Sequence, residues 1–131
     1  MIDKSMQELI ALLGSNAVTS VDIVQAFLQQ INHKQELNAY ITVLDDGALQ
    51  QAQQSDKRRK AGKPLSPFDG IPIAIKDNIC TQGILTTCAS GILKNFIPPY
   101  SATAYQKLLN AGFVVLGKTN MDEFAMGSTT E

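Results

Sequence analysis

The chain has 131 residues, of which 44% are hydrophobic and 18% are charged, and its formal net charge is −1. This balance is typical of a globular protein, not of a disordered or fibrous chain, and it gives no indication of a basic nucleic-acid surface. The longest apolar runs have about five residues, far short of the roughly 20 that span a bilayer, so we expect no membrane segment and a cytoplasmic location.

Two helix-capping patterns open the chain. Ser5-Met6-Gln7-Glu8 predicts a short helix that ends at Gly14. Thr19-Ser20-Val21-Asp22 predicts a second helix, in which His33 occupies the last turn, where a cation suits the helix dipole. Its buried stripe is expected to consist of Val24, Phe27, Leu28 and Ile31. Residues 1–35 therefore form a helical part.

Residues 36–131 alternate between strand and helix patterns. Asn38 to Leu44 is rich in β-formers and predicts a first strand. Asp45-Asp46-Gly47 is expected to turn and cap a helix that ends in the basic run Lys57-Arg58-Arg59-Lys60. We interpret that run as a solvated helix C-terminus that answers the dipole, with a nucleic-acid patch or localisation signal as the alternative.

A short apolar run that ends on a lysine stands at the centre of the chain. Residues 71–75 carry no polar side chain, which predicts a strand buried on both faces and ending at Lys76. In open α/β sheets, ligands collect beyond the carboxyl ends of the strands. The long segment 79–100, with little periodicity, is therefore expected to be a functional loop.

The remaining elements complete an α/β pattern. Ser101 is expected to cap a helix, and residues 113–116 are expected to form a third strand. Residues 121–125 are expected to form a short helical turn with Asp122 and Glu123 as first-turn charges. Strands separated by helices predict parallel crossovers in a single domain, 1–131. Residues 112–119 match the phosphate-loop pattern GxxxxGK[ST], but the positions between the glycines are the expected strand, so we do not assign nucleotide binding to them.

The cysteines do not indicate a metal centre. Cys80 and Cys88 are the two cysteines, and His33 is the one histidine. One histidine and two cysteines without a CxxC pair do not supply four zinc ligands. We expect two reduced structural thiols and no metal site, with a disulfide or metal role as the alternative.

Three blocks resemble a known enzyme family. Residues 68–79, Phe-Asp-Gly-Ile-Pro-Ile-Ala-Ile-Lys-Asp-Asn-Ile, are similar to the lysine segment of the amidase signature family, and residues 86–90 and 117–128 agree in the same order. The last block is most similar to the A subunit of glutamyl-tRNA(Gln)/aspartyl-tRNA(Asn) amidotransferases. The resemblance implies an α/β fold with a layered mixed or parallel sheet flanked by helices, as the incomplete N-terminal part of the amidase signature fold.

The resemblance also implies site residues. The family uses a Ser–cis-Ser–Lys triad, in which Lys76 would accept a proton from the bridging serine. Free lysine amines have a pKa near 10.4, so we expect a water-poor pocket that favours the neutral amine. Asp77 and Asn78 are expected to orient the loop. Met126, Gly127 and Ser128 are expected to line the amide pocket, although Gly127-Ser128 can equally form a turn.

Partners follow from the same resemblance. It implies glutamine as the amide substrate, B and C subunits, and mischarged Glu-tRNA(Gln) reached through the B subunit. ATP and Mg²⁺ would belong to the B subunit, with no cofactor in this chain. The sequence lacks the glycine- and serine-rich segment that carries both triad serines, so we expect the 131-residue chain alone to be inactive. The alternatives are a non-enzymatic binding or assembly module and an amidase acting on simple amides.

Overall fold

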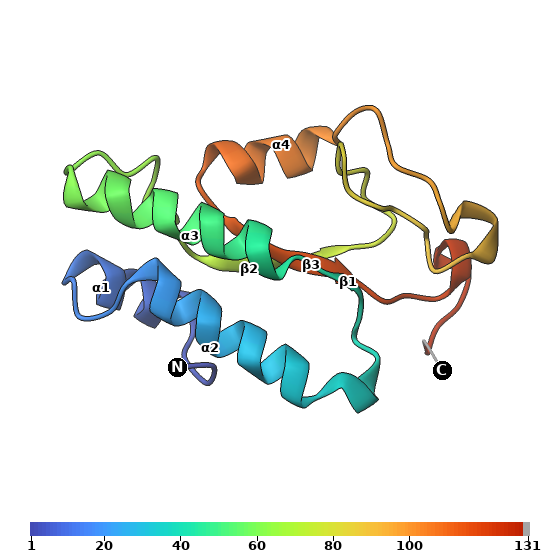
Figure 1. The fold of residues 1–131 in the computed structure, drawn as a ribbon, viewed down its shortest axis with the longest axis horizontal. Helices are drawn as coiled ribbons and strands as arrows, with labels where there is room; N and C mark the ends of the chain where they lie inside the picture. The colour runs from blue at the N-terminus through green and yellow to red at the C-terminus, as the bar shows by residue number, and fades with distance from the viewer. Residues whose placement is uncertain (130–131) are drawn as a thin grey trace.

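The computed structural model describes residues 1–129, in which a three-stranded sheet lies between helices (Figure 1). The helices are α1 (Met6–Gly14), α2 (Ser20–His33), α3 (Asp45–Lys60) and α4 (Thr103–Asn110). The strands are β1 (Tyr40–Val43), β2 (Pro72–Lys76) and β3 (Val114–Thr119). Three short 3₁₀ helices are η1 (Gln35–Leu37), η2 (Gly91–Leu93) and η3 (Glu123–Ala125). Within residues 1–129, none of the helices has the length and apolar character that crossing a membrane requires.

Both predicted capping boxes are confirmed. The hydroxyl of Ser5 accepts a hydrogen bond from the Glu8 backbone N–H, and the Glu8 carboxylate accepts from the Ser5 N–H. Thr19 and Asp22 make the same reciprocal pair at the start of α2. These local bonds satisfy N–H groups that have no partner inside the helix, which is why both helices begin where the sequence predicts.

The sheet is mixed, with the order β1-β3-β2. β2 and β3 run parallel, joined by a connection that contains α4, as predicted. The expectation that all crossovers are parallel is wrong for β1, which runs antiparallel to β3. The chain that follows α2 reaches the carboxyl end of β3 before β1 begins, and there the Asn120 N–H donates to the Ala39 carbonyl at 2.9 Å. From that point β1 runs back along β3, in the opposite direction.

The central strand β3 holds the core together. Val114 and Leu116 pack against α2 and α3, whereas Val115 packs with Ile75 and with Tyr105 of α4. A β-bulge between β2 and β3 skips Leu116, and the Val115 N–H donates instead to the side chain of Gln51 in α3 at 3.0 Å. The predicted burial of this strand on both faces is confirmed.

The same prediction for β2 is wrong. Ile71 and Ile75 are buried, but Ala74 and Lys76 are exposed and Pro72 and Ile73 are half-buried. β2 is an edge strand of the described sheet, so one of its sides has no neighbouring strand. An apolar run does not by itself show which elements cover it.

Two predicted helix starts are also wrong in detail. Asp45, Asp46 and Gly47 lie inside the first turn of α3, and Leu44 is its N-cap, without a side-chain bond. Ser101 does not cap α4: Ala102 does, and the Ser101 hydroxyl accepts from the Gln82 N–H at 3.0 Å. Neither helix start therefore has a side-chain capping bond.

The basic run at the end of α3 turns partly inward. Arg58 binds the Asp69 carboxylate, and Arg59 donates to the carbonyls of Pro67 and Asp69. Lys57 and Lys60 lie with them in the last turn. Two of the four cations thus hold the connector before β2. The expected solvated helix terminus is right for the exposed Lys57 and Lys60 and wrong for Arg58 and Arg59.

Candidate functional site

The candidate site lies where β2 and β3 both end. Lys76 is the last residue of β2 and pairs with Thr119, the last residue of β3. Beyond this edge, the loop 79–100 and η3 lie side by side at one end of the molecule (Figure 1). This is the edge at which the fold class places ligands.

The Lys76 side chain is exposed. Within residues 1–129 its amine makes no hydrogen bond or ion pair. The water-poor pocket expected around it is therefore not formed by the described part of the chain. The Lys76 amine thus lies at the carboxyl end of β2 and is accessible there.

Asp77 turns the chain immediately after Lys76. Its side chain is fully buried, and one carboxylate oxygen accepts from the Thr87 N–H at 2.9 Å and from the Thr87 hydroxyl at 2.5 Å. Its backbone N–H donates to the Thr119 carbonyl, and its carbonyl accepts from the Cys88 N–H. The predicted role of Asp77 in orienting the loop is thus visible in its contacts.

The other Asp77 oxygen lies 3.2 Å from the ammonium of Lys118, and neither side chain has any exposed surface. The same ammonium donates to the Ile79 carbonyl at 3.0 Å and to the hydroxyls of Thr81 at 3.1 Å and Thr86 at 2.8 Å. Burial lowers the pKa of the Lys118 amine, and the Asp77 carboxylate only partly offsets that effect. Lys118 therefore forms the centre of a closed polar cluster under the loop.

Lys118 was not among the predicted site residues. It appeared only as the lysine of a phosphate-loop pattern. The structure confirms a strand between the two glycines of that pattern, but β3 (Val114–Thr119) extends past the expected 113–116 and includes Lys118. A signal was present nonetheless: Lys118 follows a buried apolar strand in the same way as Lys76 does. Two lysines at the same end of two strands indicate a shared site region.

Left-handed backbone marks the segments beside the cluster. Cys88 and Ala89 have φ of 52° and 54°, and Phe124 and Ala125 have φ of 52° and 60°. These two pairs are tied together, because the Phe124 N–H donates to the Cys88 carbonyl and the Ser90 hydroxyl donates to Glu123 at 2.6 Å. Glu123 is thus a long-range partner and not only a first-turn helix charge. Strained non-glycine residues of this kind persist where surrounding contacts fix them, often at functional sites.

The thiol of Cys88 does not have the environment of a nucleophile. Cys80 and Cys88 are both half-buried free thiols. Burial and then the Asp77 charge raise the pKa of the Cys88 thiol, which disfavours the reactive thiolate. Within residues 1–129, no group of three or more histidine, cysteine, aspartate and glutamate residues is arranged to hold a metal ion.

The predicted pocket residues Met126, Gly127 and Ser128 follow η3, which comes after the carboxyl end of β3. Met126 is 79% exposed, and Ser128 is exposed as well. A Cβ at Gly127 would lie 2.5 Å from Cγ of Asp122, so the backbone at Gly127 passes close to that side chain. Their role in substrate binding stays a prediction.

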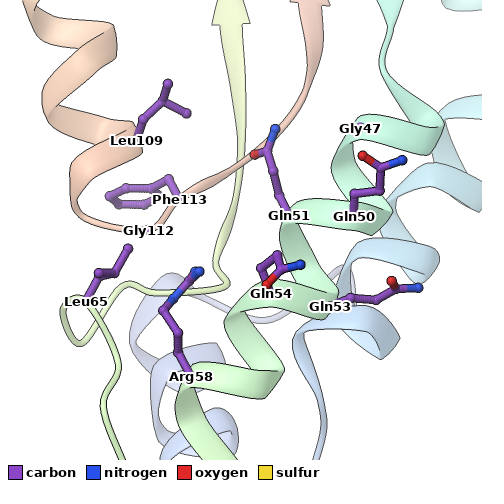
Figure 2. Close-up of a pocket in the computed structure, with 10 residues that line it drawn as sticks. All are labelled: Gly47, Gln50, Gln51, Gln53, Gln54, Arg58, Leu65, Leu109, Gly112 and Phe113. Carbon is purple, nitrogen blue, oxygen red and sulfur yellow. The ribbon is translucent and has the colours of Figure 1, made fainter.

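A groove of about 520 Å³ lies elsewhere, between α3 and α4 (Figure 2). Figure 2 shows glutamine side chains of α3 on one side and Leu65, Leu109 and Phe113 on the other. Gly112 and Phe113 precede β3, so this groove lies at the amino end of that strand, away from Lys76. It contains none of the predicted site residues.

The chain is similar to known proteins over most of its length. Residues 22–131 match the sequence model of the Amidase family. The chain is 52% identical over 128 residues to the A subunit of the human mitochondrial glutamyl-tRNA(Gln) amidotransferase, covering 98% of this chain and 24% of that protein. It is 49% identical over 132 residues to the A subunit of the glutamyl-tRNA(Gln) amidotransferase from Lachnospira eligens, covering 100% of this chain and 27% of that protein.

The fold has solved counterparts. The peptide amidase of Stenotrophomonas maltophilia superposes with a TM-score of 0.87 at 34% identity, over 93% of this chain and 26% of that one. The chain therefore spans about a quarter of the length of the relatives it matches.

Proposed function

Because the chain belongs to the amidase family, we propose that it is the N-terminal portion of the glutaminase subunit of a tRNA-dependent amidotransferase. The observation that carries this proposal is the 49–52% identity to amidotransferase A subunits over 98–100% of the chain. The position of Lys76 at the carboxyl end of β2 supports it. The whole protein would hydrolyse the side-chain amide of glutamine and supply ammonia for converting Glu-tRNA(Gln) to Gln-tRNA(Gln).

In this proposal Lys76 is the terminal proton acceptor of a serine relay. The nucleophilic serine bonds to the amide carbon, and its proton passes through the bridging serine to the neutral Lys76 amine. Return of the proton lets ammonia leave with the C–N bond broken, and water then releases glutamate from the acyl-enzyme. The exposed amine requires a cover from the remainder of the protein, which would remove water and favour its neutral form.

The proposed partners belong to the complete complex. The B subunit would bind ATP, Mg²⁺ and the mischarged tRNA, and the C subunit would brace the pair, in the cytoplasm. This chain contributes the lysine, the loop anchored by Asp77, and the segment Met126-Gly127-Ser128 near the amide.

A chimera tests the proposal. The chain replaces the matching residues of the Lachnospira eligens protein, and ammonia release from glutamine is measured in the assembled complex. We expect activity in the parental chimera and a loss of about 10³-fold or more in Lys76→Ala, as for removal of other relay members. The matched control is Lys63→Ala, another exposed lysine. Full activity in Lys76→Ala would refute the assignment.

The isolated 131-residue chain is expected to release no ammonia. Release that Lys76→Ala abolishes would overturn this expectation. The amidase alternative is tested with the same chimera, because hydrolysis of simple amides in preference to glutamine would favour it.

The alternative of a non-enzymatic module makes a different prediction. Its apolar surface would be functional as it stands, so the chain would be a stable monomer. Ile92, Ile97 and Met126 are 82%, 57% and 79% exposed, and β1 and β2 are both edge strands. Such edges and patches promote association. Light scattering decides: association supports the proposal, and a stable monomer supports the module.

A further inference from the structure

One buried polar cluster beside Lys76 has no part in the proposed relay. The ammonium of Lys118 contacts four oxygen atoms, from Asp77, Ile79, Thr81 and Thr86. All four belong to the first ten residues after Lys76. A single side chain of β3 thus holds the loop that begins at the candidate base.

The two lysines leave the sheet on opposite faces. In the parallel ladder Lys118 pairs with Ile75, and Thr119 pairs with Lys76. Successive residues of a strand point to opposite faces, so the side chains of Lys118 and Lys76 diverge. Lys118 therefore acts on Lys76 through the backbone and not as a second proton acceptor.

The backbone at Lys76 is fixed by contacts that the cluster organises. The Lys76 carbonyl accepts from the Ile79 N–H at 3.0 Å, and the Ile79 carbonyl accepts from the Lys118 ammonium. The Asp77 N–H donates to the Thr119 carbonyl at 3.2 Å, and the Asp77 carboxylate faces the same ammonium at 3.2 Å. Since β2 has a neighbouring strand on one side only within residues 1–129, these contacts supply restraint at its end.

Resting on the proposed function, we propose that Lys118, with Asp77 and Thr86, is a positioning group that fixes the end of β2 and aims the Lys76 amine at the bridging serine. Well-packed apolar residues often replace both members of a buried ion pair without loss of stability, so stability alone does not require a Lys118–Asp77 pair at this position. Alignment of the Lys76 backbone is the property that requires this lysine, because its ammonium has three N–H donors and fixed acceptors around it. A displacement of about 1 Å in a catalytic group can cost about 100-fold in rate.

The test uses the chimera and a conservative pair of variants. Thr86→Val removes one acceptor of the ammonium, whereas Thr86→Ser keeps the hydroxyl and removes a methyl group. We expect kcat for ammonia release to fall about 10-fold in Thr86→Val with KM changed less than about twofold, and Thr86→Ser to retain kcat within about twofold. Lys118→Met is expected to lose about 100-fold in kcat.

Hydrogen exchange gives a readout that does not need activity. In Thr86→Val and Lys118→Met, the amides of Ile79 and Cys88 are expected to exchange at least about 10-fold faster, with Thr86→Ser like the parent. Equal kcat and equal exchange in Thr86→Val and Thr86→Ser would overturn the proposal. So would a Lys118→Met variant that is folded by circular dichroism and keeps the parental kcat.

The two proposals fail in different ways. If Lys76→Ala leaves activity intact, the proposed function fails, and the positioning role fails with it. If Lys76→Ala abolishes activity while Thr86→Val and Lys118→Met keep the parental kcat, only the positioning role fails.

Discussion

Arg58 grips the carboxylate of Asp69 at two points, with Nε 2.8 Å from Oδ2 and Nη2 2.6 Å from Oδ1. The pair ties the last turn of α3 to the turn before β2, and the Asp69 side chain is completely buried. Burial alone would raise the pKa of Asp69, but the Arg58 guanidinium and the Leu65 N–H outweigh it and hold that pKa below its usual value. Arg58 thus fixes the position of the turn that leads into β2, the strand that ends at the candidate site.

Arg58→Leu should destabilise the chain by about 2–3 kcal/mol near neutral pH, because it leaves a buried carboxylate with few donors. The depressed pKa of Asp69 gives a contribution to stability that is complete above the unfolded-state pKa near 4 and is lost as pH falls. The variant lacks this contribution, so the stability difference should shrink from about pH 7 to about pH 3. Urea unfolding at both pH values measures it.

Arg59→Leu is the matched control for that experiment. Arg59 donates to the carbonyls of Pro67 and Asp69, which do not titrate. Its cost should therefore be independent of pH. A pH-independent cost for Arg58→Leu as well would contradict the assigned role of the ion pair.

Gly112→Ala should destabilise the fold by about 2 kcal/mol or more. Gly112 has φ of +89°, and an added Cβ would lie 2.5 Å from Oδ1 and 2.8 Å from Cα of Asp69. Gly47→Ala is the control, because nothing lies within 4 Å of a Cβ at that helical position. It should stabilise α3 by about 0.5 kcal/mol. Equal effects of the two substitutions on the unfolding midpoint would refute this account.

Lys76→Ala should change the free energy of unfolding by less than about 0.5 kcal/mol, because the side chain is exposed. Lys118→Ala should cost about 3–5 kcal/mol, because it leaves the buried Asp77 carboxylate without its cation. Chemical denaturation of both variants measures the contrast. A large loss of stability in Lys76→Ala would mean that its activity data report unfolding instead of chemistry.

Thr87→Val should cost about 1.5–3 kcal/mol, the usual range for a hydrogen bond to a charged group. The Thr87 hydroxyl donates to the buried Asp77 carboxylate at 2.5 Å, and valine cannot donate. Thr42→Val in β1 is the control, since the half-buried Thr42 side chain makes no hydrogen bond within residues 1–129. We expect less than about 0.5 kcal/mol there. Similar costs at both positions would argue against an anchoring role for Thr87.

Local interactions explain which parts of the fold could be predicted. The capping boxes at Ser5 and Thr19 use partners three residues away, so the sequence alone locates both helix starts. The apolar runs before Lys76 and Lys118 likewise predict two strands. Neither pattern contains information on which strand is central, and the burial of β2 was therefore overestimated.

Long-range contacts explain what was missed at the site. Lys118 finds its hydroxyl and carbonyl partners 32 to 39 residues earlier in the chain. No local pattern encodes such a contact, and the glycine-lysine-threonine run suggested an unrelated motif. The direction of β1 was missed for the same reason, because it depends on where the chain that follows α2 meets β3.

The sequence by itself determined the helix starts, the strand that carries Lys76, and the family resemblance, because these depend on neighbouring residues and on short ordered blocks. Tertiary structure alone decided that Lys76 is exposed at an edge strand while Lys118, one strand away, is buried against Asp77. The physical reason is desolvation: whether an amine keeps its water depends on what the rest of the chain places around it.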